Sequence, residues 1–368
     1  MAEKGSVQAQ LTLGWMYAFG EGVPEDDQQA LLWYRKAAAQ GHTEAQYILG
    51  AMYAEGLGVP KDNQKAINWL LKSARQGFAE AQYLLATLYA DGEAVAKDNQ
   101  KALNWLLKSA EQGYAEAQFS LSRVYILGNA VPRDAKQAVR WLLKSAQQGY
   151  TKAQYNLGLM YASGEMLPKD DKQAVKWLLQ SAQQGFAKAQ NNLGFMYFKG
   201  IGVAKDNREA VKWYLKSAQQ GYAKAQYNLG LIYAGGEMVP KDDKQAVKWL
   251  LQSAQQGYAA AQSNLGAMYD FGRGVPENNQ EAIKWYLKSA RQGHATAQYN
   301  LGVAYANGEG VSEDNISSYV WYSMAKASGN KMAVTAIERL KNNMTKQQLA
   351  ESRILAGNCY RSHFIDCE

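Results

Sequence analysis

A tryptophan recurs every 36 residues along this chain, and this period constrains the fold more than any other feature. The series is Trp33, Trp69, Trp105, Trp141, Trp177, Trp213, Trp249, Trp285 and Trp321. A glycine series that starts at Gly41 and a tyrosine series that starts at Tyr17 keep the same spacing without insertion or deletion. Self-similarity with a period of about 20–50 residues indicates a repeat array in which each unit contacts only its neighbours.

Each repeat predicts two helices. In residues 45–53 the apolar side chains recur at helical spacing, and Gly50 lies beside them, where a missing side chain lets a neighbouring helix come close. The segment 55–61 ends this helix with two glycines and a proline, and Asp62 or Asn63 is placed to cap the next one.

The second helix carries Ala66, Trp69, Leu70 and Ala74 on one side, and Gly77 ends it in the left-handed conformation. One such hairpin cannot bury its apolar stripe alone, but stacked hairpins cover one another. The sequence therefore predicts an all-α, superhelical solenoid of about nine 36-residue hairpins.

The pattern A-x-x-W-x-x-x-A-x-x-G-x-x-x-A-Q-x-x-L-G-x-x-Y-x-x-G-x-G-V-x-x-D resembles the Sel1-like repeat, a relative of the tetratricopeptide repeat. The resemblance covers residues 5–328, and the segment "YVWYSMAKASGNKMA" is similar to the ending of many Sel1-like proteins. It implies an adaptor or ligand-binding scaffold, often of bacterial envelopes, secretion or host contact, and no shared catalytic residue. The departures are Ser122 and Ala86 in place of glycine, and Ala96, Ala204 and Ser312 in place of the loop proline.

The chain divides into three predicted parts. Residues 1–4 are a truncated N-terminus, because the array begins almost at once; we expect the native N-terminus and any signal peptide to lie upstream. Residues 5–328 form nine repeats. Residues 329–368 form capping helices, including one at about 345–356 over the last apolar face, and a cysteine-containing tail.

Positions that vary between repeats and face outward are the place to look for function. On the first helix, the side opposite the core carries the positions of Glu44, Tyr47 and Ala51. In tetratricopeptide-like arrays the first helix lines the concave surface, so the resemblance places this strip in a groove. The predicted partner-binding residues are Trp15, Glu44, Tyr47, Glu80, Tyr83, Glu116, Phe119, Arg123, Lys152, Tyr155, Lys188, Phe195, Lys224, Tyr227 and Tyr299.

Charge varies systematically along this strip. Glutamate occupies its first position in the early repeats and lysine in the middle ones, and residues 149–260 carry 14 basic against 8 acidic side chains. Aromatic anchors and oriented charges suit a protein partner. The alternatives are that the charges are ordinary solvated side chains and that the tyrosines pack between neighbouring first helices.

An asparagine series also leans outward: Asn156, Asn192, Asn228, Asn264 and Asn300. Amides in register can bind an extended backbone, and the alternative is that each asparagine satisfies a carbonyl of the adjacent repeat.

The sequence argues against catalysis, cofactors and nucleic acid. No metalloprotease, hydrolase or phosphate-loop motif is present, and His42 and His294 occupy aromatic positions of the repeat. We therefore expect no catalytic residue, no cofactor and no metal, and we interpret the acidic loops "PKDDKQ" as helix caps rather than cation sites. The net charge of +7 is small for 368 residues and includes no arginine-rich run.

Cys359 and Cys367 lie outside the array, eight residues apart. A cytosolic protein can carry both as free thiols, whereas an envelope protein uses such a pair to close a loop. We favour the disulfide, and with it a periplasmic, surface or secreted location.

The expected function is a non-enzymatic scaffold whose concave groove binds a protein. The repeats resemble those of enterobacterial secreted or envelope Sel1-like proteins, immunoglobulin-binding members included, so the resemblance implies a host immunoglobulin-type partner. The alternatives are a cytosolic or periplasmic adaptor for a signalling or secretion complex, and a cell-wall glycan-binding module. No apolar run is long enough to span a bilayer.

Overall fold

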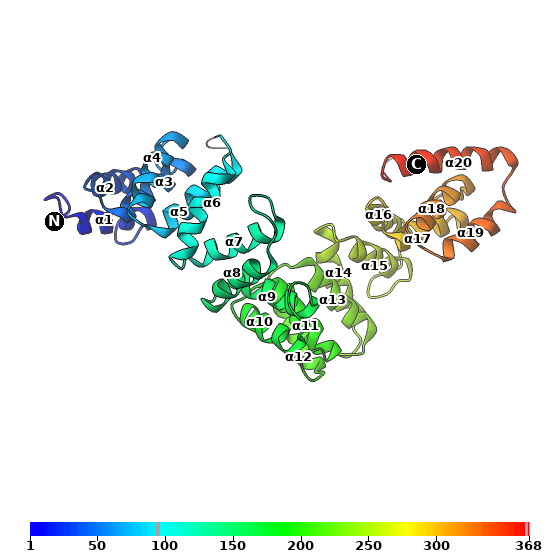
Figure 1. The fold of residues 1–368 in the computed structure, drawn as a ribbon. Helices are drawn as coiled ribbons and strands as arrows, with labels where there is room; N and C mark the ends of the chain where they lie inside the picture. The colour runs from blue at the N-terminus through cyan, green and yellow to red at the C-terminus, as the bar shows by residue number, and fades with distance from the viewer. Residues whose placement is uncertain (93–95, 365–366, 368) are drawn as a thin grey trace. The chain divides into compact units, whose positions relative to one another are not determined.

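The computed structural model describes residues 1–92, 96–364 and 367, and in these residues every regular element is an α-helix (Figure 1). The first helices of the nine repeats are α1 (Val7–Phe19), α3 (Thr43–Glu55), α5 (Ala79–Asp91), α7 (Ala115–Leu127), α9 (Thr151–Ser163), α11 (Ala187–Lys199), α13 (Ala223–Gly235), α15 (Ala259–Asp270) and α17 (Ala295–Asn307). The second helices are α2 (Asp27–Ala39), α4 (Asn63–Arg75), α6 (Asn99–Glu111), α8 (Ala135–Gln147), α10 (Asp171–Gln183), α12 (Asn207–Gln219), α14 (Asp243–Gln255), α16 (Asn279–Ala290) and α18 (Asn315–Ala327).

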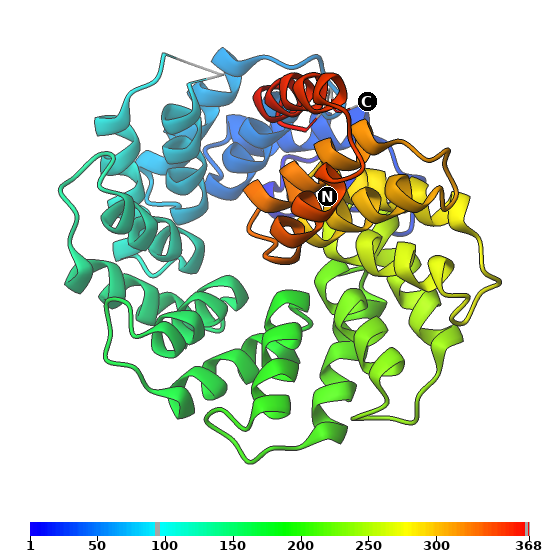
Figure 2. The ribbon, with the colours of Figure 1, turned by 90° about the vertical axis from the view of Figure 1, so that its right-hand side faces the viewer.

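The chain forms two compact units, Met1–Gln184 and Gly185–Glu368. Within each unit, every repeat helix packs against the next one along the chain, as the colour sequence in Figure 2 shows. Each unit is therefore an α/α solenoid built by stacking hairpins, and the predicted fold class is confirmed.

The predicted stop and start signals act as expected at the hairpin turns. Gly56 ends α3 with a φ of 83°. Asp62 caps α4, because its Oδ1 accepts a hydrogen bond of 2.9 Å from the Lys65 backbone N–H. Gly77 follows α4 with a φ of 94°. These left-handed positions favour glycine, which has no Cβ to clash.

Apolar side chains between the two helices of each hairpin form the core. Leu49 and Leu70 are fully buried, and a Cβ placed on Gly50 would lie 2.7 Å from Leu70 Cγ. The missing side chain at Gly50 is therefore what allows α3 and α4 to pack closely. The repeated tryptophans are structural as well: Trp141, for example, is 6% exposed, with the Lys144 ammonium 4.5 Å from its ring centre.

A buried ladder of polar side chains joins successive repeats. The buried Gln46 side chain donates to the Ala38 carbonyl at 3.2 Å and accepts from Gln76 Nε2 at 2.8 Å. Ser73 Oγ donates to the Thr43 carbonyl at 2.8 Å. Equivalent bonds recur in both units, including Gln148 to Gln118 and Gln256 to Gln226. This ladder satisfies polar groups at the junctions between hairpins.

The C-terminal segment covers the last hairpin of the second unit. After α19 (Met332–Lys341), α20 (Lys346–Arg361) packs against α18, beginning where the expected capping helix does and running past 356. Cys359 and Cys367 form a disulfide, and both are buried against the core around Trp321. Among the described residues, no helix has the length and apolarity that a membrane span needs.

Candidate functional site

The first helices leave crevices between them in each unit. We call the surface that these helices present, at the positions of Glu44, Tyr47 and Ala51 in α3, the first-helix wall. In the first unit, crevices of about 700 and 290 Å³ lie between α7 and α9 and between α5 and α7. In the second unit, crevices of about 410 and 650 Å³ lie between α11 and α13 and between α15 and α17. These volumes are in the range of binding sites for single side chains or short segments.

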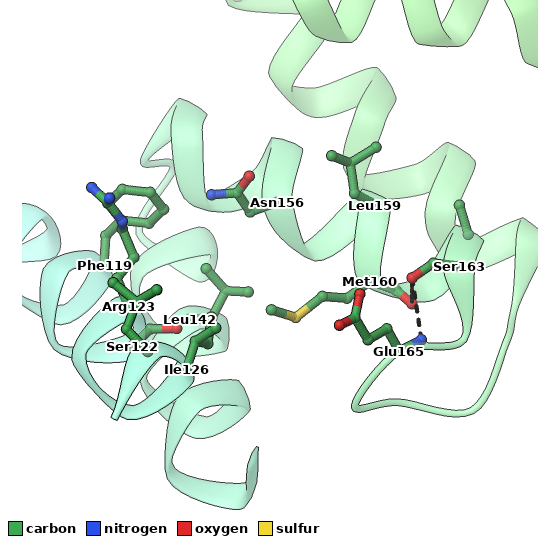
Figure 3. Close-up of a pocket in the computed structure, with 12 residues that line it drawn as sticks. Phe119, Ser122, Arg123, Ile126, Leu142, Asn156, Leu159, Met160, Ser163 and Glu165 are labelled. Carbon is green, nitrogen blue, oxygen red and sulfur yellow. Dashed lines mark hydrogen bonds between the residues drawn. The ribbon is translucent and has the colours of Figure 1, made fainter. Parts of the chain in front are cut away.

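The crevice between α7 and α9, which we call the α7–α9 crevice, is the largest of these. Phe119, Arg123 and Ile126 of α7 line one side, and Asn156, Leu159 and Met160 of α9 line the other (Figure 3). Leu142 of α8 lies between the two first helices. Its walls are mostly apolar, with polar groups from both helices at the edge.

The crevice between α11 and α13 repeats this arrangement with different side chains. Phe195 stands at the position of Arg123, Leu231 at that of Leu159, and Tyr214 at that of Leu142. The same backbone geometry thus presents an arginine at one wall position in the first unit and a phenylalanine there in the second. Variation at fixed positions is what distinguishes the crevices.

Most of the predicted aromatic residues contact the aromatic ring that lies directly before the next first helix. Tyr47 is half-buried, with its ring centre 5.3 Å from that of Phe78, and the same tilted pairing joins Tyr83 to Tyr114 and Tyr227 to Tyr258. Phe119 is 9% exposed and pairs with Tyr150. Tyr299 pairs with Tyr322, and Tyr155 is half-buried. Most of these rings pack one first helix against the start of the next, and Tyr299 packs within its own hairpin. Tyr83, Phe119 and Tyr299 also line crevices.

The most exposed predicted residues lie one turn further along each first helix. Trp15 is 43% exposed and Phe195 is 46% exposed, and Leu231 is 41% exposed at the same repeat position. Large apolar side chains at this exposure lose water contact when a partner covers them. Arg123 occupies this position in α7 and is exposed.

The predicted charges lie in the first turn of the first helices. Burial, together with the Glu80 and Glu116 carboxylates, raises the pKa of Tyr47. Tyr114 donates a hydrogen bond of 3.4 Å to Glu116 Oε2. Glutamates and tyrosines of the first unit therefore lie close together. Glu44 is exposed, as are all the predicted lysines: Lys152, Lys188 and Lys224.

The asparagine series bonds mostly to neighbouring side chains. Asn228 donates to Asn191 Oδ1 at 3.0 Å, and Asn264 hydrogen-bonds to Tyr227. The alternative of a structural role is therefore right for these residues, although the partner is a side chain rather than the expected carbonyl. Asn156, Asn228 and Asn300 also line crevices, and Asn156 differs from the other two in that its side chain hydrogen-bonds to no described residue (Figure 3).

The described residues contain no group of three or more His, Cys, Asp or Glu side chains that could hold a metal ion. Asp170 of the "PKDDKQ" loop caps α10, accepting from the Lys172 and Gln173 backbone N–H groups. His42 accepts from the Ala45 N–H at the start of α3. Burial lowers the pKa of His294, which keeps its imidazole neutral.

Sequence reasoning missed two sets of residues. It noted Ser122 only as a departure from glycine, and it did not find Ile126, Leu142 and Met160 as crevice residues. The signal was present in one repeat: Phe119, Ser122 and Arg123 all depart from the usual residue types within five positions. It also missed the glutamine ladder, whose partners lie 30 residues apart.

The Sel1 repeat family model matches nine consecutive segments of the chain: residues 7–42, 43–78, 79–114, 115–150, 151–186, 187–222, 223–258, 259–294 and 295–330. No curated protein matches the chain.

Two solved structures are similar over most of their length. One is c5321, a protective antigen present in uropathogenic Escherichia coli strains that displays an SLR fold; it is 30% identical, the match covers 100% of this chain and 94% of that one, and the TM-score is 0.54. The other is a Sel1 repeat protein from Oxalobacter formigenes, 34% identical, with 86% and 94% covered and a TM-score of 0.64.

Proposed function

Because this chain belongs to the Sel1 repeat family, whose members mediate protein–protein interactions, we propose that it is a non-enzymatic scaffold that binds a partner protein through its first-helix wall. The observation that carries the proposal is the recurrence of crevices at equivalent positions, each lined by different side chains. A rigid backbone with variable wall residues can recognise one partner sequence at several points.

Exposed apolar side chains support the choice of this wall. Trp15, Phe195 and Leu231 lie at one repeat position, and each is more than 40% exposed. Interfaces are enriched in large aromatic residues and in arginine. At this repeat position the first repeat has Trp15, the fourth has Arg123 and the sixth has Phe195. Glu80 and Glu116 in one unit and Lys188 and Lys224 in the other would orient the partner.

The disulfide supports a location outside the cytoplasm. Cys359 and Cys367 are paired, and disulfides persist in oxidising compartments such as the periplasm and the exterior. We include in the proposal a periplasmic, surface or secreted protein. The description of c5321 as a protective antigen supports a host-contact role, and a host immunoglobulin-type protein is the partner that we propose to test first.

Site-specific photo-crosslinking tests the proposal, first with added host immunoglobulin and then in the producing cell. A photoreactive amino acid replaces Phe195 on α11 in one variant, and in the matched control it replaces Lys212, whose side chain is 56% exposed on the second helix α12. We expect covalent adducts with one protein from the Phe195 variant and none from the control. Adducts from the control alone, or equal adducts from both, would contradict the proposal.

A further inference from the structure

Three polar side chains around the α7–α9 crevice have no partner among the described residues. They are Ser122 and Arg123 of α7 and Asn156 of α9. In Figure 3 the Asn156 amide points across the crevice toward Phe119 and Arg123. Each of the three is unpaired because of a local departure from the repeat.

Asn156 has lost the partner that its equivalents keep. In the α5–α7 pair, the Tyr83 hydroxyl and Ser120 Oγ lie 3.3 Å apart in a hydrogen bond. In the second unit, the same two positions are joined by the 3.0 Å bond from Asn228 to Asn191. Phe119 stands at the position of Tyr83 and offers no polar atom. The Asn156 amide is therefore left with its donors and acceptor free for a ligand.

Ser122 carries a polar group at a position that is glycine in most repeats. Its side chain is fully buried, and its Oγ has no hydrogen-bond partner among the described residues. A buried hydroxyl without a partner destabilises the folded state. Gly50 and Gly158 show that the repeat has an alternative without this cost. Ser122 is one of the residues that line the crevice.

Arg123 is the one charged side chain at its repeat position, where the other residues are Trp15, Ala51, Thr87, Leu159, Phe195, Leu231, Ala267 and Val303. It is exposed and forms no ion pair with any described residue. A guanidinium in this setting favours a carboxylate, which it can bind through two parallel hydrogen bonds.

The crevice has an apolar interior, and its two ends carry opposite charges. Ile126, Leu142 and Met160 form its interior, so it favours an aliphatic side chain. Glu165 lies beyond Met160, at the end away from Arg123 (Figure 3). A carboxylate is thus attracted to one end and repelled from the other.

We propose that the α7–α9 crevice binds an acidic residue followed by an aliphatic residue in an extended segment of the partner protein. The carboxylate contacts Arg123 and the Asn156 amide. The aliphatic side chain enters between Ile126, Leu142 and Met160. This inference rests on the proposed function and deepens it, because it specifies the chemistry of one contact on the first-helix wall.

Titration followed by methyl NMR tests the inference, since residues that carry methyl groups line the crevice on both sides. The probe is the blocked peptide acetyl-Gly-Asp-Leu-Gly-amide, and its control has Asn in place of Asp. We expect the acidic peptide to shift the signals of Ile126, Leu142, Leu159 and Met160, with affinity about tenfold above that of the control. The methyl signals of Leu231 and Ile232, in the equivalent α11–α13 crevice, serve as the internal reference and show no preference for the acidic peptide.

Three variants sharpen the result. Arg123→Glu abolishes the preference for the acidic peptide, whereas Arg123→Lys keeps part of it. Phe119→Tyr weakens binding, because it restores a hydrogen-bond partner for Asn156. An unchanged methyl spectrum away from the crevice shows that each variant is folded.

Equal binding of the two peptides, or a preference that survives Arg123→Glu, would overturn the inference. If the acidic peptide fails to bind while the Phe195 variant still crosslinks to a partner, the inference fails and the proposed function stands. Loss of the Phe195 crosslink would instead count against the proposed function.

Discussion

At one first-turn position of the first helices, glutamate in the early repeats is replaced by lysine in the middle ones. The replacement lowers the stability of the helix. Glu44, Glu80 and Glu116 place negative charge near the positive end of a helix dipole. Lys152, Lys188 and Lys224 place positive charge there, which costs roughly 0.3–1 kcal/mol each. No described residue forms an ion pair with these lysines to offset the cost. We therefore propose that these lysines serve partner binding rather than stability.

The double substitution Lys188→Glu with Lys224→Glu separates these two roles. We expect partner binding to be lost, because the charge of the second unit's wall is reversed. The thermal midpoint should stay the same or rise, because glutamate suits the helix N-terminus. Calorimetry and binding to the crosslinked partner measure both quantities. Binding that survives the reversal would exclude the lysines from the contact surface.

Asp270 gives a pH-dependent prediction at the residue scale. Burial raises its pKa above the usual 3.8, and Glu309 and Glu277 raise it further, while the Tyr286 hydroxyl donates to Oδ2 at 3.1 Å. The folded state thus binds this proton more tightly than the unfolded state, so stability falls as pH rises from about 3.8 through the folded pKa.

Asp270→Asn should therefore stabilise the protein at pH 7 and have no effect below pH 3.8. An asparagine oxygen still accepts the Tyr286 hydrogen bond, so the packing is kept. Urea unfolding at pH 3.5 and pH 7 measures the difference. A variant that is less stable at pH 7 would show that the carboxylate has a favourable partner.

At the scale of the helix pair, the buried glutamines hold one hairpin to the next. Gln118 donates to the Ala110 carbonyl at 3.0 Å and accepts from Gln148 at 2.7 Å, and it is only 4% exposed. Gln118→Ala should lower the free energy of unfolding by about 1–3 kcal/mol, because it leaves buried polar groups without partners. Gln100→Ala, at an exposed helix position, is the control and should change stability by less than about 0.5 kcal/mol. Equal effects in urea unfolding would rule out this role for the ladder.

We expect the local stability of the C-terminal helix α20 to depend on the disulfide between Cys359 and Cys367. Cys359 of α20 is fully buried, and its disulfide joins the helix to Cys367, which is buried in the same core cluster as Trp321 of α18. Reduction should raise the rate of amide hydrogen exchange in α20, while exchange in α11–α15 stays unchanged. The loss in local stability should be about 2–3 kcal/mol for a loop of this size. Unchanged exchange in α20 would show that packing alone holds it.

Most of the element-level structure follows from the sequence, because local chemistry determines it. The period located both helices of each hairpin, and the caps at Asp62 and Gly77 were readable from residue type alone. The partners of Gln46 and Asn228 were not readable, since they depend on the distance between neighbouring hairpins. For the same reason the sequence placed Arg123 on the wall and did not reveal the crevice beside it.

For the molecule as a whole, the repeated and the varying residues have separate tasks. The leucines, glycines and glutamines that keep the period fill the core and the junctions of both units. The side chains that depart from it, such as Arg123 and Phe195, line the crevices. Charged residues also vary between repeats at the wall. Residues 149–260 carry 14 basic and 8 acidic side chains, and the basic ones include the wall lysines Lys152, Lys188 and Lys224.

A substitution scan read out for both partner binding and folding tests this division most directly. Each position is changed to alanine, and the defects are compared between equivalent positions of the 36-residue repeats. We predict that binding defects gather at the wall position of Arg123, at the crevice positions of Ile126 and Asn156, and at their equivalents, while folding defects gather at the positions of Leu121 and Gln118. Binding defects on the exposed faces of the second helices, or at the same positions as the folding defects, would contradict the account.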